Sequence, residues 1–129
     1  MTLAPCRVLV VDDNEETAEL LEVLLGRSGH DVRVAHDVDE ALRIAGEFEP
    51  QVALLDIMIR CESGYFLARQ IRALPHLESC QIVAITGFAQ DQLRQASEAA
   101  GFQGHLTKPI DDGALFDALE ACSSATQKL

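Results

Sequence analysis

The sequence predicts an α/β fold in which one parallel β-sheet is covered by helices on both faces. Short apolar runs alternate along the chain with segments whose apolar residues recur at helical spacing. This alternation is typical of successive βα units, which place their strands in a parallel sheet. The run at 52–55 is apolar throughout, as expected of a strand that is covered on both faces. The length of 129 residues suits a single domain.

Five strands are predicted from runs of β-branched and aliphatic residues. They lie at 7–11, 31–35, 52–55, 81–85 and 104–107. The second run alternates polar and apolar residues, which is typical of a strand at the edge of a sheet. Right-handed crossover connections leave few strand orders. We expect the flavodoxin-like, doubly wound order 2-1-3-4-5, in which the first and third strands are neighbours and ligands bind beyond their carboxyl ends.

Five helices are predicted to connect and follow these strands. The first two span 15–28 and 38–48, and the third ends before Pro75, because the residue before a proline disfavours the helical conformation. The last helix is expected to end at Cys122, so residues 1–122 form the domain and residues 123–129 a flexible tail. The apolar residues that predict the helices are, in chain order, Ala18, Leu21, Leu25, Val38, Ala41, Leu42, Ala45, Phe66, Leu67, Ile71, Leu74, Leu93, Ala96, Ala100, Leu115, Ala118, Leu119 and Cys122.

Acidic, hydroxyl and basic side chains stand where the apolar strands end. Asp12 and Asp13 follow the first strand, and Asp56 follows the third. Thr86 follows the fourth and Lys108 the fifth. Because the carboxyl ends of parallel strands meet at one edge of the sheet, we expect these five side chains to lie together. Three carboxylates in one place repel one another unless a cation compensates them.

This set of side chains suits a divalent cation and a phosphoryl group. Mg²⁺ takes oxygen ligands and often keeps several water molecules, so it can bridge to a phosphoryl oxygen. Asp56 would serve as the nucleophile and form an aspartyl phosphate. Lys108 and Thr86 would bind the oxygens of the phosphoryl group, since positioning and neutralisation are the main requirements of phosphoryl transfer.

In the order and spacing of these residues, the chain resembles the receiver domain of response regulators in bacterial two-component (phosphorelay) signalling. The resemblance covers about residues 6–121 and implies that Asp56 accepts a phosphoryl group from a histidine kinase or a phosphotransfer domain. The motifs that carry it are Val-Leu-Val-Val-Asp-Asp-Asn ending at Asn14, Ala-Leu-Leu-Asp-Ile-Met ending at Met58, Ser-Gly-Tyr ending at Tyr65, Ile-Thr-Gly ending at Gly87 and His-Leu-Thr-Lys-Pro ending at Pro109.

The resemblance also implies which residues hold the metal ion. Asp13 would bind Mg²⁺ (or Mn²⁺) directly, and Asp12 would bind it mainly through water. Asp56 would be a further ligand, and Met58 would contribute its backbone carbonyl oxygen. Carboxylate and carbonyl oxygens are ligands that Mg²⁺ accepts.

The resemblance also implies a switch that responds to the phosphoryl group. Thr86 would move to bond it and Lys108 would pair with it, while His105 occupies the place of the switch residue that turns into the vacated space. The surface formed by the fourth helix, the fifth strand and the fifth helix would then change and signal to a downstream effector protein or domain. Such a domain is a signalling module and not an enzyme, because it catalyses only its own Mg²⁺-dependent phosphorylation and dephosphorylation.

One segment departs from the family. Receiver domains usually carry proline where Arg60 stands, methionine where Glu62 stands and often aspartate where Ser63 stands. This segment borders the site. The departure therefore bears on the shape of the loop and on the rate of phosphorylation, and the assignment of Asp56 does not depend on it.

Three alternative functions are compatible with a fold of this class. A pseudo-receiver would be a pure interaction module that does not use phosphate, and it would bind no beryllofluoride in the presence of Mg²⁺. A phosphatase of the haloacid dehalogenase type would need a second acid two positions after the nucleophile, where Met58 stands in this chain. A flavin- or nucleotide-binding module is disfavoured, because the loop after the first strand is acidic and carries no glycine-rich phosphate cradle.

Charge and hydropathy limit the partners. The formal net charge is −11, which disfavours direct nucleic-acid binding, because phosphate backbones are normally bound by basic patches. The apolar runs are shorter than the roughly 18 residues that a membrane span needs, and no secretory signal opens the chain. We therefore expect a cytoplasmic protein without a membrane partner. The four cysteines show no metal-binding spacing and are expected to be reduced thiols.

Overall fold

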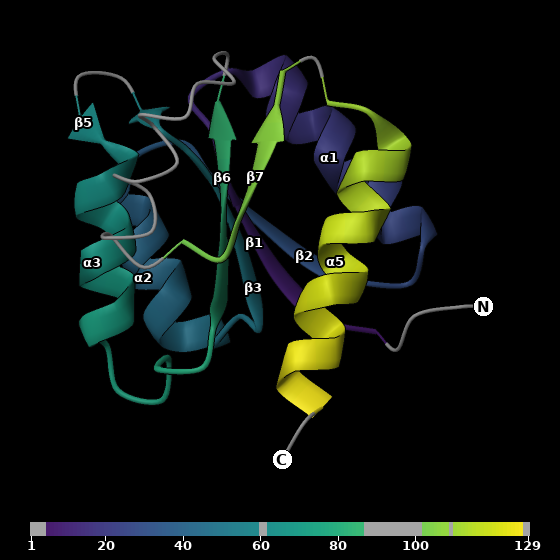
Figure 1. Ribbon diagram of the computed structural model, residues 1–129. Helices are drawn as coiled ribbons and strands as arrows, with labels where there is room; N and C mark the ends of the chain where they lie inside the picture. Colours follow the sequence, from purple (N-terminus) through teal and green to yellow (C-terminus); the bar gives the residue numbers. More distant parts are fainter. Residues whose placement is uncertain (1–4, 60–61, 87–101, 109, 128–129) are drawn as a thin grey trace.

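The computed structural model describes residues 5–59, 62–86, 102–108 and 110–127. Five parallel strands form one sheet in the order β2-β1-β3-β6-β7 (Figure 1). This is the predicted order 2-1-3-4-5, and the predicted flavodoxin-like fold class is confirmed. The strands are β1 (Arg7–Val11), β2 (Asp31–Ala35), β3 (Val52–Asp56), β6 (Gln81–Thr86) and β7 (Gly104–Thr107).

Helices cover both faces of the sheet. In Figure 1, α1 (Glu15–Arg27) and α5 (Asp112–Gln127) lie on one face, and α2 (Val38–Phe48) and α3 (Gly64–Ala73) lie on the other. The fourth predicted helix falls at 87–101, outside the described residues. Since the strands run in parallel, all five point their carboxyl ends towards the same edge of the sheet.

Each face of the sheet has its own hydrophobic core. Along β1, Val8 and Val10 pack in the core with α1 and α5, while Leu9 and Val11 pack in the core with α2 and α3. This alternation follows from the two-residue period of a strand. All residues of β3 are buried, so the prediction of a strand covered on both faces is confirmed. The two cores leave the strand ends as the place where polar side chains gather.

Three details differ from the sequence prediction. Phe66 was expected on the buried face of the third helix, but it is 48% exposed, and the buried face is centred on Leu67 and Ile71. A short antiparallel pair, β4 (Met58–Ile59) and β5 (Glu62–Ser63), lies where a loop was expected. The last helix continues to Gln127, beyond its expected end at Cys122, so residues 123–127 of the expected tail are helical.

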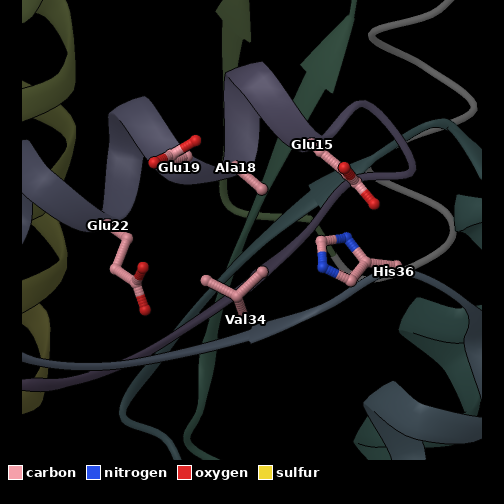
Figure 2. A pocket seen from close by; sticks show the side chains of 6 residues that line it. All are labelled: Glu15, Ala18, Glu19, Glu22, Val34 and His36. Carbon is pink, nitrogen blue, oxygen red and sulfur yellow. The ribbon is translucent and has the colours of Figure 1, made fainter.

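A pocket of about 350 Å³ opens between α1 and β2, next to the carboxyl edge of the sheet (Figure 2). Its walls carry three glutamates of α1 and the imidazole of His36, which follows β2 directly. The residues that line the pocket are Glu15, Ala18, Glu19, Glu22, Val34 and His36.

No helix in the described part of the chain is long and apolar enough to cross a membrane.

Candidate functional site

Three carboxylates meet at the carboxyl edge of the sheet. Asp12 and Asp56 are buried and Asp13 is exposed. One ligand oxygen from each lies within 4.8 Å of the others. This proximity follows from the strand register, because Val11 of β1 stands opposite Leu55 of β3, so the next residue of each strand is an aspartate. The cluster thus combines two desolvated carboxylates with one that faces solvent.

The turn from β1 into α1 holds Asp12 in place. The Asp12 amide N–H donates to the carbonyl oxygen of Ala35 at 3.2 Å and extends the pairing with β2 by one step. Asp12 Oδ1 accepts the amide N–H of Asn14 at 2.9 Å. Asn14 in turn is the N-cap of α1, because its side chain accepts the N–H of Thr17 at 3.1 Å. The same turn therefore begins the helix and orients the acid.

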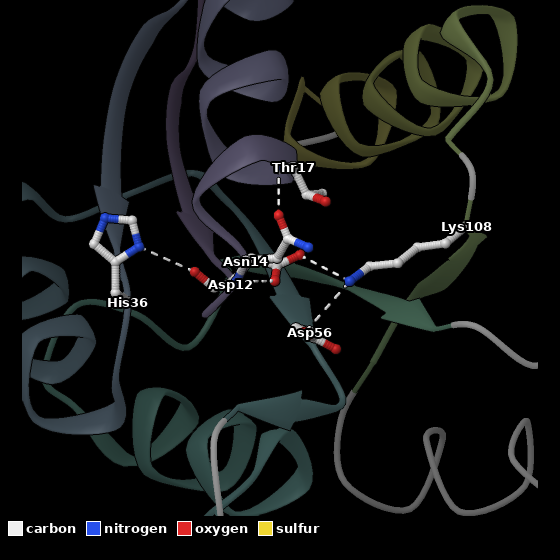
Figure 3. A network of polar contacts seen from close by, with 6 residues as sticks. All are labelled: Asp12, Asn14, Thr17, His36, Asp56 and Lys108. Atoms are coloured by element: carbon white, nitrogen blue, oxygen red, sulfur yellow. Dashed lines mark hydrogen bonds and ion pairs between the residues drawn. The ribbon is translucent and has the colours of Figure 1, made fainter.

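Lys108 supplies the positive charge of the site. Its ammonium nitrogen lies 3.1 Å from Asp12 Oδ2 and 3.5 Å from Asp56 Oδ2 (Figure 3). Burial acts to lower the pKa of Lys108, but contact with Asp12 and the negative charges of Asp12 and Asp56 outweigh it, so the pKa is raised. Lys108 is therefore charged at neutral pH, and it compensates part of the repulsion between the carboxylates.

Thr86 and His105 lie on one face of the sheet. Thr86 is the last residue of β6 and is buried, and His105 of β7 is half-buried and stands opposite Ala84. Residues two apart on a strand share a face, so His105 lies on the face that also carries Thr86. Asp56 is opposite Ile85, so Thr86 ends its strand one step beyond the acid. The two expected switch residues thus lie on neighbouring strands and on one face, and Thr86 stands two residues beyond the position opposite His105.

The chain after Asp56 turns back against the strand. The Gly64 amide N–H donates to the carbonyl oxygen of Ile57 at 2.6 Å, and Met58 pairs with Ser63 in the short antiparallel pair. A methyl group at Gly64 would lie 2.9 Å from Ile57 Cα and closer still to the carbonyl oxygen of Asp56. A side chain there has no room. The turn that would carry the Met58 carbonyl is therefore packed directly on the peptide of Asp56.

The donor set fits a hard divalent cation. All three clustered side chains offer carboxylate oxygens, which is the ligand type of Mg²⁺. The buried Oδ2 atom of Asp12 accepts no hydrogen bond from the described residues, and the Lys108 ammonium is its ion-pair partner. A cation would satisfy that oxygen further and reduce the repulsion within the cluster.

The structure thus brings together the residues that the sequence singled out at the strand ends. It also adds residues that the sequence did not indicate. Asn14 could have been found from the preference of asparagine for N-caps. His36 had no such signal, because its contact with Asp12 depends on the register between β1 and β2. Pro109 and Gly87, which border Lys108 and Thr86, lie outside the described residues.

Fold and acid cluster together define a receiver-type α/β domain. The family model of the response regulator receiver domain matches residues 8–120. The chain belongs to this family, as the motifs predicted. It is 36% identical over 110 residues to an uncharacterised 14.6 kDa protein of Leptolyngbya boryana, covering 85% of this chain and 84% of that protein. It also matches the response regulator PleD of Caulobacter vibrioides at 36% identity, over 85% of this chain and 24% of PleD.

Solved structures of receiver domains share the fold of this chain. The receiver domain of the sensor histidine kinase PA1611 from Pseudomonas aeruginosa is 27% identical to this chain, with a TM-score of 0.83. The match covers 94% of this chain and 99% of the PA1611 domain. That structure has a magnesium ion coordinated in its active site cleft.

Proposed function

We propose that this receiver domain is a phosphoacceptor switch in which Asp56 takes a phosphoryl group from a histidine kinase or a phosphotransfer domain. The observation that carries the proposal is the position of Asp56. It is buried at a strand end, lies within 4.8 Å of two further acids, and has the Lys108 ammonium 3.5 Å from its Oδ2 atom. The site thereby combines a nucleophile with the positive charge that a phosphoryl group requires.

The reaction uses the carboxylate of Asp56 as the nucleophile. One of its oxygens attacks the phosphorus of a phosphohistidine, the P–O bond forms, the P–N bond breaks, and the imidazole leaves with the electron pair. Lys108 stays protonated because its pKa is raised, so it can pair with the transferred group. The buried position of Asp56 limits the access of water to the product.

A bound Mg²⁺ would neutralise the phosphoryl oxygens and orient them for transfer. Asp13 would hold the ion directly and Asp12 mainly through water, with the Asp56 carboxylate and the Met58 carbonyl as further ligands. Support comes from the oxygen-only donor set of the cluster. The magnesium ion in the PA1611 receiver domain adds to it. Mn²⁺ has the same ligand preference and would serve in its place.

Phosphorylation would be read on the face that carries Thr86 and His105. The phosphoryl group adds a charge of about −1.5 to −2 and new acceptor oxygens. The Thr86 hydroxyl would move to bond them, and His105 would turn into the space that Thr86 leaves. The surface formed by the fourth helix, β7 and α5 would then signal to a downstream effector protein or domain. We place this receiver unit at residues 1–122, with its last helix continuing to Gln127, and its action in the cytoplasm.

The test is phosphorylation by acetyl phosphate in the presence of Mg²⁺. We expect the wild-type chain to gain one phosphoryl group by intact-protein mass spectrometry, and Asp56→Asn to gain none while it keeps its circular dichroism spectrum. Asp39→Asn, on the exposed first turn of α2, is the matched control and should react like the wild-type chain. Labelling that persists in Asp56→Asn would contradict the assignment. A wild-type chain that neither reacts nor binds beryllofluoride with Mg²⁺ would be a pseudo-receiver.

A further inference from the structure

His36 contacts the acid cluster from the side of β2. Its ring nitrogen Nδ1 lies 3.1 Å from the backbone carbonyl oxygen of Asp12 (Figure 3). Since a carbonyl oxygen can only accept, Nδ1 carries the hydrogen and the ring donates. The bond joins residues that are 24 positions apart in the sequence. It therefore fixes the end of β1 against the segment that leaves β2.

The ring replaces a backbone donor that the sheet loses at this point. In the register of β1 and β2, Asp12 would stand opposite His36, and its amide N–H reaches the carbonyl oxygen of Ala35. A parallel ladder that continued would bring the N–H of residue 37 to the Asp12 carbonyl. Asp37 instead leaves the sheet and caps α2, where its side chain accepts the N–H of Glu40 at 2.8 Å. The imidazole of His36 occupies the donor position that Asp37 gives up.

His36 is itself held by α2. Its own amide N–H donates to Glu40 Oε1 at 2.8 Å. The start of α2, the His36 ring and the Asp12 carbonyl therefore form one chain of hydrogen bonds. That carbonyl belongs to the peptide bond that joins Asp12 to Asp13. Restraining its plane restrains the backbone of Asp13, the exposed member of the cluster.

We infer that His36 is a positioning residue of the acid cluster, which holds the Asp12–Asp13 peptide so that the Asp13 carboxylate stays where a cation can reach it together with Asp12 and Asp56. The inference rests on the proposed function, because it assigns a purpose to the geometry of the proposed metal ligands. Asp12 is then held at four atoms: the amide N–H by the Ala35 carbonyl, Oδ1 by the Asn14 N–H, Oδ2 by Lys108 and the carbonyl oxygen by His36.

The surroundings of the ring make the inference testable. His36 is half-buried and lines the pocket beside α1, where it lies near Glu15 in Figure 2. Replacing the ring of this half-buried side chain therefore changes a pocket wall. A change in metal affinity can then be separated from a general loss of packing.

The experiment compares His36→Leu with His36→Asn in the full chain. Leucine keeps the bulk and removes the donor, whereas the amide nitrogen of asparagine takes the place of Nδ1. Isothermal titration calorimetry with MgCl₂ should show affinity weakened about three- to tenfold in His36→Leu, as expected for one lost hydrogen bond, and near the wild-type value in His36→Asn. Val34→Ala changes the same pocket wall at a side chain that packs against the core under α1 and α5, so it is the control for lost packing and should bind like the wild-type chain.

Hydrogen exchange of the Asp13 and Asn14 amides, measured without metal, provides a second readout. We expect both amides to exchange faster in His36→Leu and at the wild-type rate in His36→Asn. Equal Mg²⁺ affinities in all four proteins, or equal weakening in the leucine and asparagine variants, would overturn the inference while leaving the proposed function intact. If the wild-type chain bound no Mg²⁺, the proposed function would fail, and the exchange rates would still decide whether His36 restrains the Asp12–Asp13 peptide.

Discussion

Gly64→Ala is predicted to displace Asp56, the proposed phosphoacceptor, because the added methyl group would collide with its backbone. A methyl group at this position would lie 2.9 Å from Ile57 Cα and 3.1 Å from the carbonyl carbon of Asp56, where ordinary contacts begin at 3.4 Å. The obstructing atoms belong to the backbone, so no side chain can rotate away. Gly64 does not adopt a positive φ. The effect would therefore come from the close contact alone and not from a conformation reserved for glycine.

The expected magnitude has two parts. Overpacking of this kind costs about 1–3 kcal/mol. Displacing α3 also weakens the hydrogen bond from the Gly64 N–H to the Ile57 carbonyl, which adds about 1 kcal/mol. We expect the free energy of unfolding to fall by about 2–4 kcal/mol, which a domain of ordinary stability, about 5–15 kcal/mol, survives. A displacement of Asp56 on the order of 1 Å would slow phosphorylation by acetyl phosphate about 100-fold.

Urea unfolding and the rate of phosphorylation by acetyl phosphate measure the two effects on the same protein. Gly46→Ala is the matched control, because a methyl group there meets nothing within 4 Å. It lies inside α2, so alanine should stabilise the chain by about 0.5–1 kcal/mol and leave the rate unchanged. The reasoning would be refuted if Gly64→Ala unfolded at the wild-type urea concentration and reacted at the wild-type rate.

Two further predictions concern stability. Burial lowers the pKa of His30, and its Nδ1 accepts the Cys6 N–H at 3.0 Å, so the unfolded state binds a proton first as the pH falls. The contribution of neutral His30 to the free energy of unfolding is then complete above about pH 6.5, and it falls at lower pH by at most about 1.4 kcal/mol per pH unit. Between pH 7.5 and 5.5, the urea midpoint should therefore fall less steeply in His30→Phe than in the wild-type chain. Equal slopes in the two proteins would contradict this. Arg72 donates to the carbonyl oxygens of Leu77, Glu78 and Cys80 at 3.4, 2.9 and 2.6 Å. Arg72→Ala should lower the free energy of unfolding by about 2–4 kcal/mol, whereas Arg69→Ala, exposed on the same helix, should change it by less than about 0.5 kcal/mol.

Most strands could be predicted closely because β1, β3 and β6 are buried on both faces and β2 alternates polar and apolar residues. The runs at 7–11, 31–35 and 104–107 coincide with β1, β2 and β7. The other two are one residue longer than predicted, because Asp56 and Thr86 continue the ladder into the site. Parallel strand ends have to meet at one edge, so the sequence alone could also place the acids of that edge together. The roles assigned to them stay predictions.

Other features depend on contacts that a linear pattern does not contain. Phe66 fits the helical period beside Leu67, but Ala68 takes the buried position, and a small alanine gives a weak apolar signal. The antiparallel pair after Asp56 has strands of two residues each, too short for any periodicity. His36 contacts Asp12, which lies 24 residues earlier in the chain, because of the register between β1 and β2. Such contacts appear only when the neighbouring strand is known.

The reach of Lys108 has a mechanical consequence. In the sheet order β1-β3-β6-β7, this residue follows the edge strand β7, yet its ammonium pairs with acids that end β3 and follow β1. Neighbouring strands stand about 4.8 Å apart, and β6 lies between β3 and β7. The Lys108 side chain therefore extends over the end of β6, and its ion pairs connect the edge strand of the sheet to the central strands. A change in the charge of Asp56 alters the attraction between its carboxylate and the Lys108 ammonium. Lys108, and with it the end of β7, would then shift in response to a change at Asp56 even if every residue of β6 kept its place.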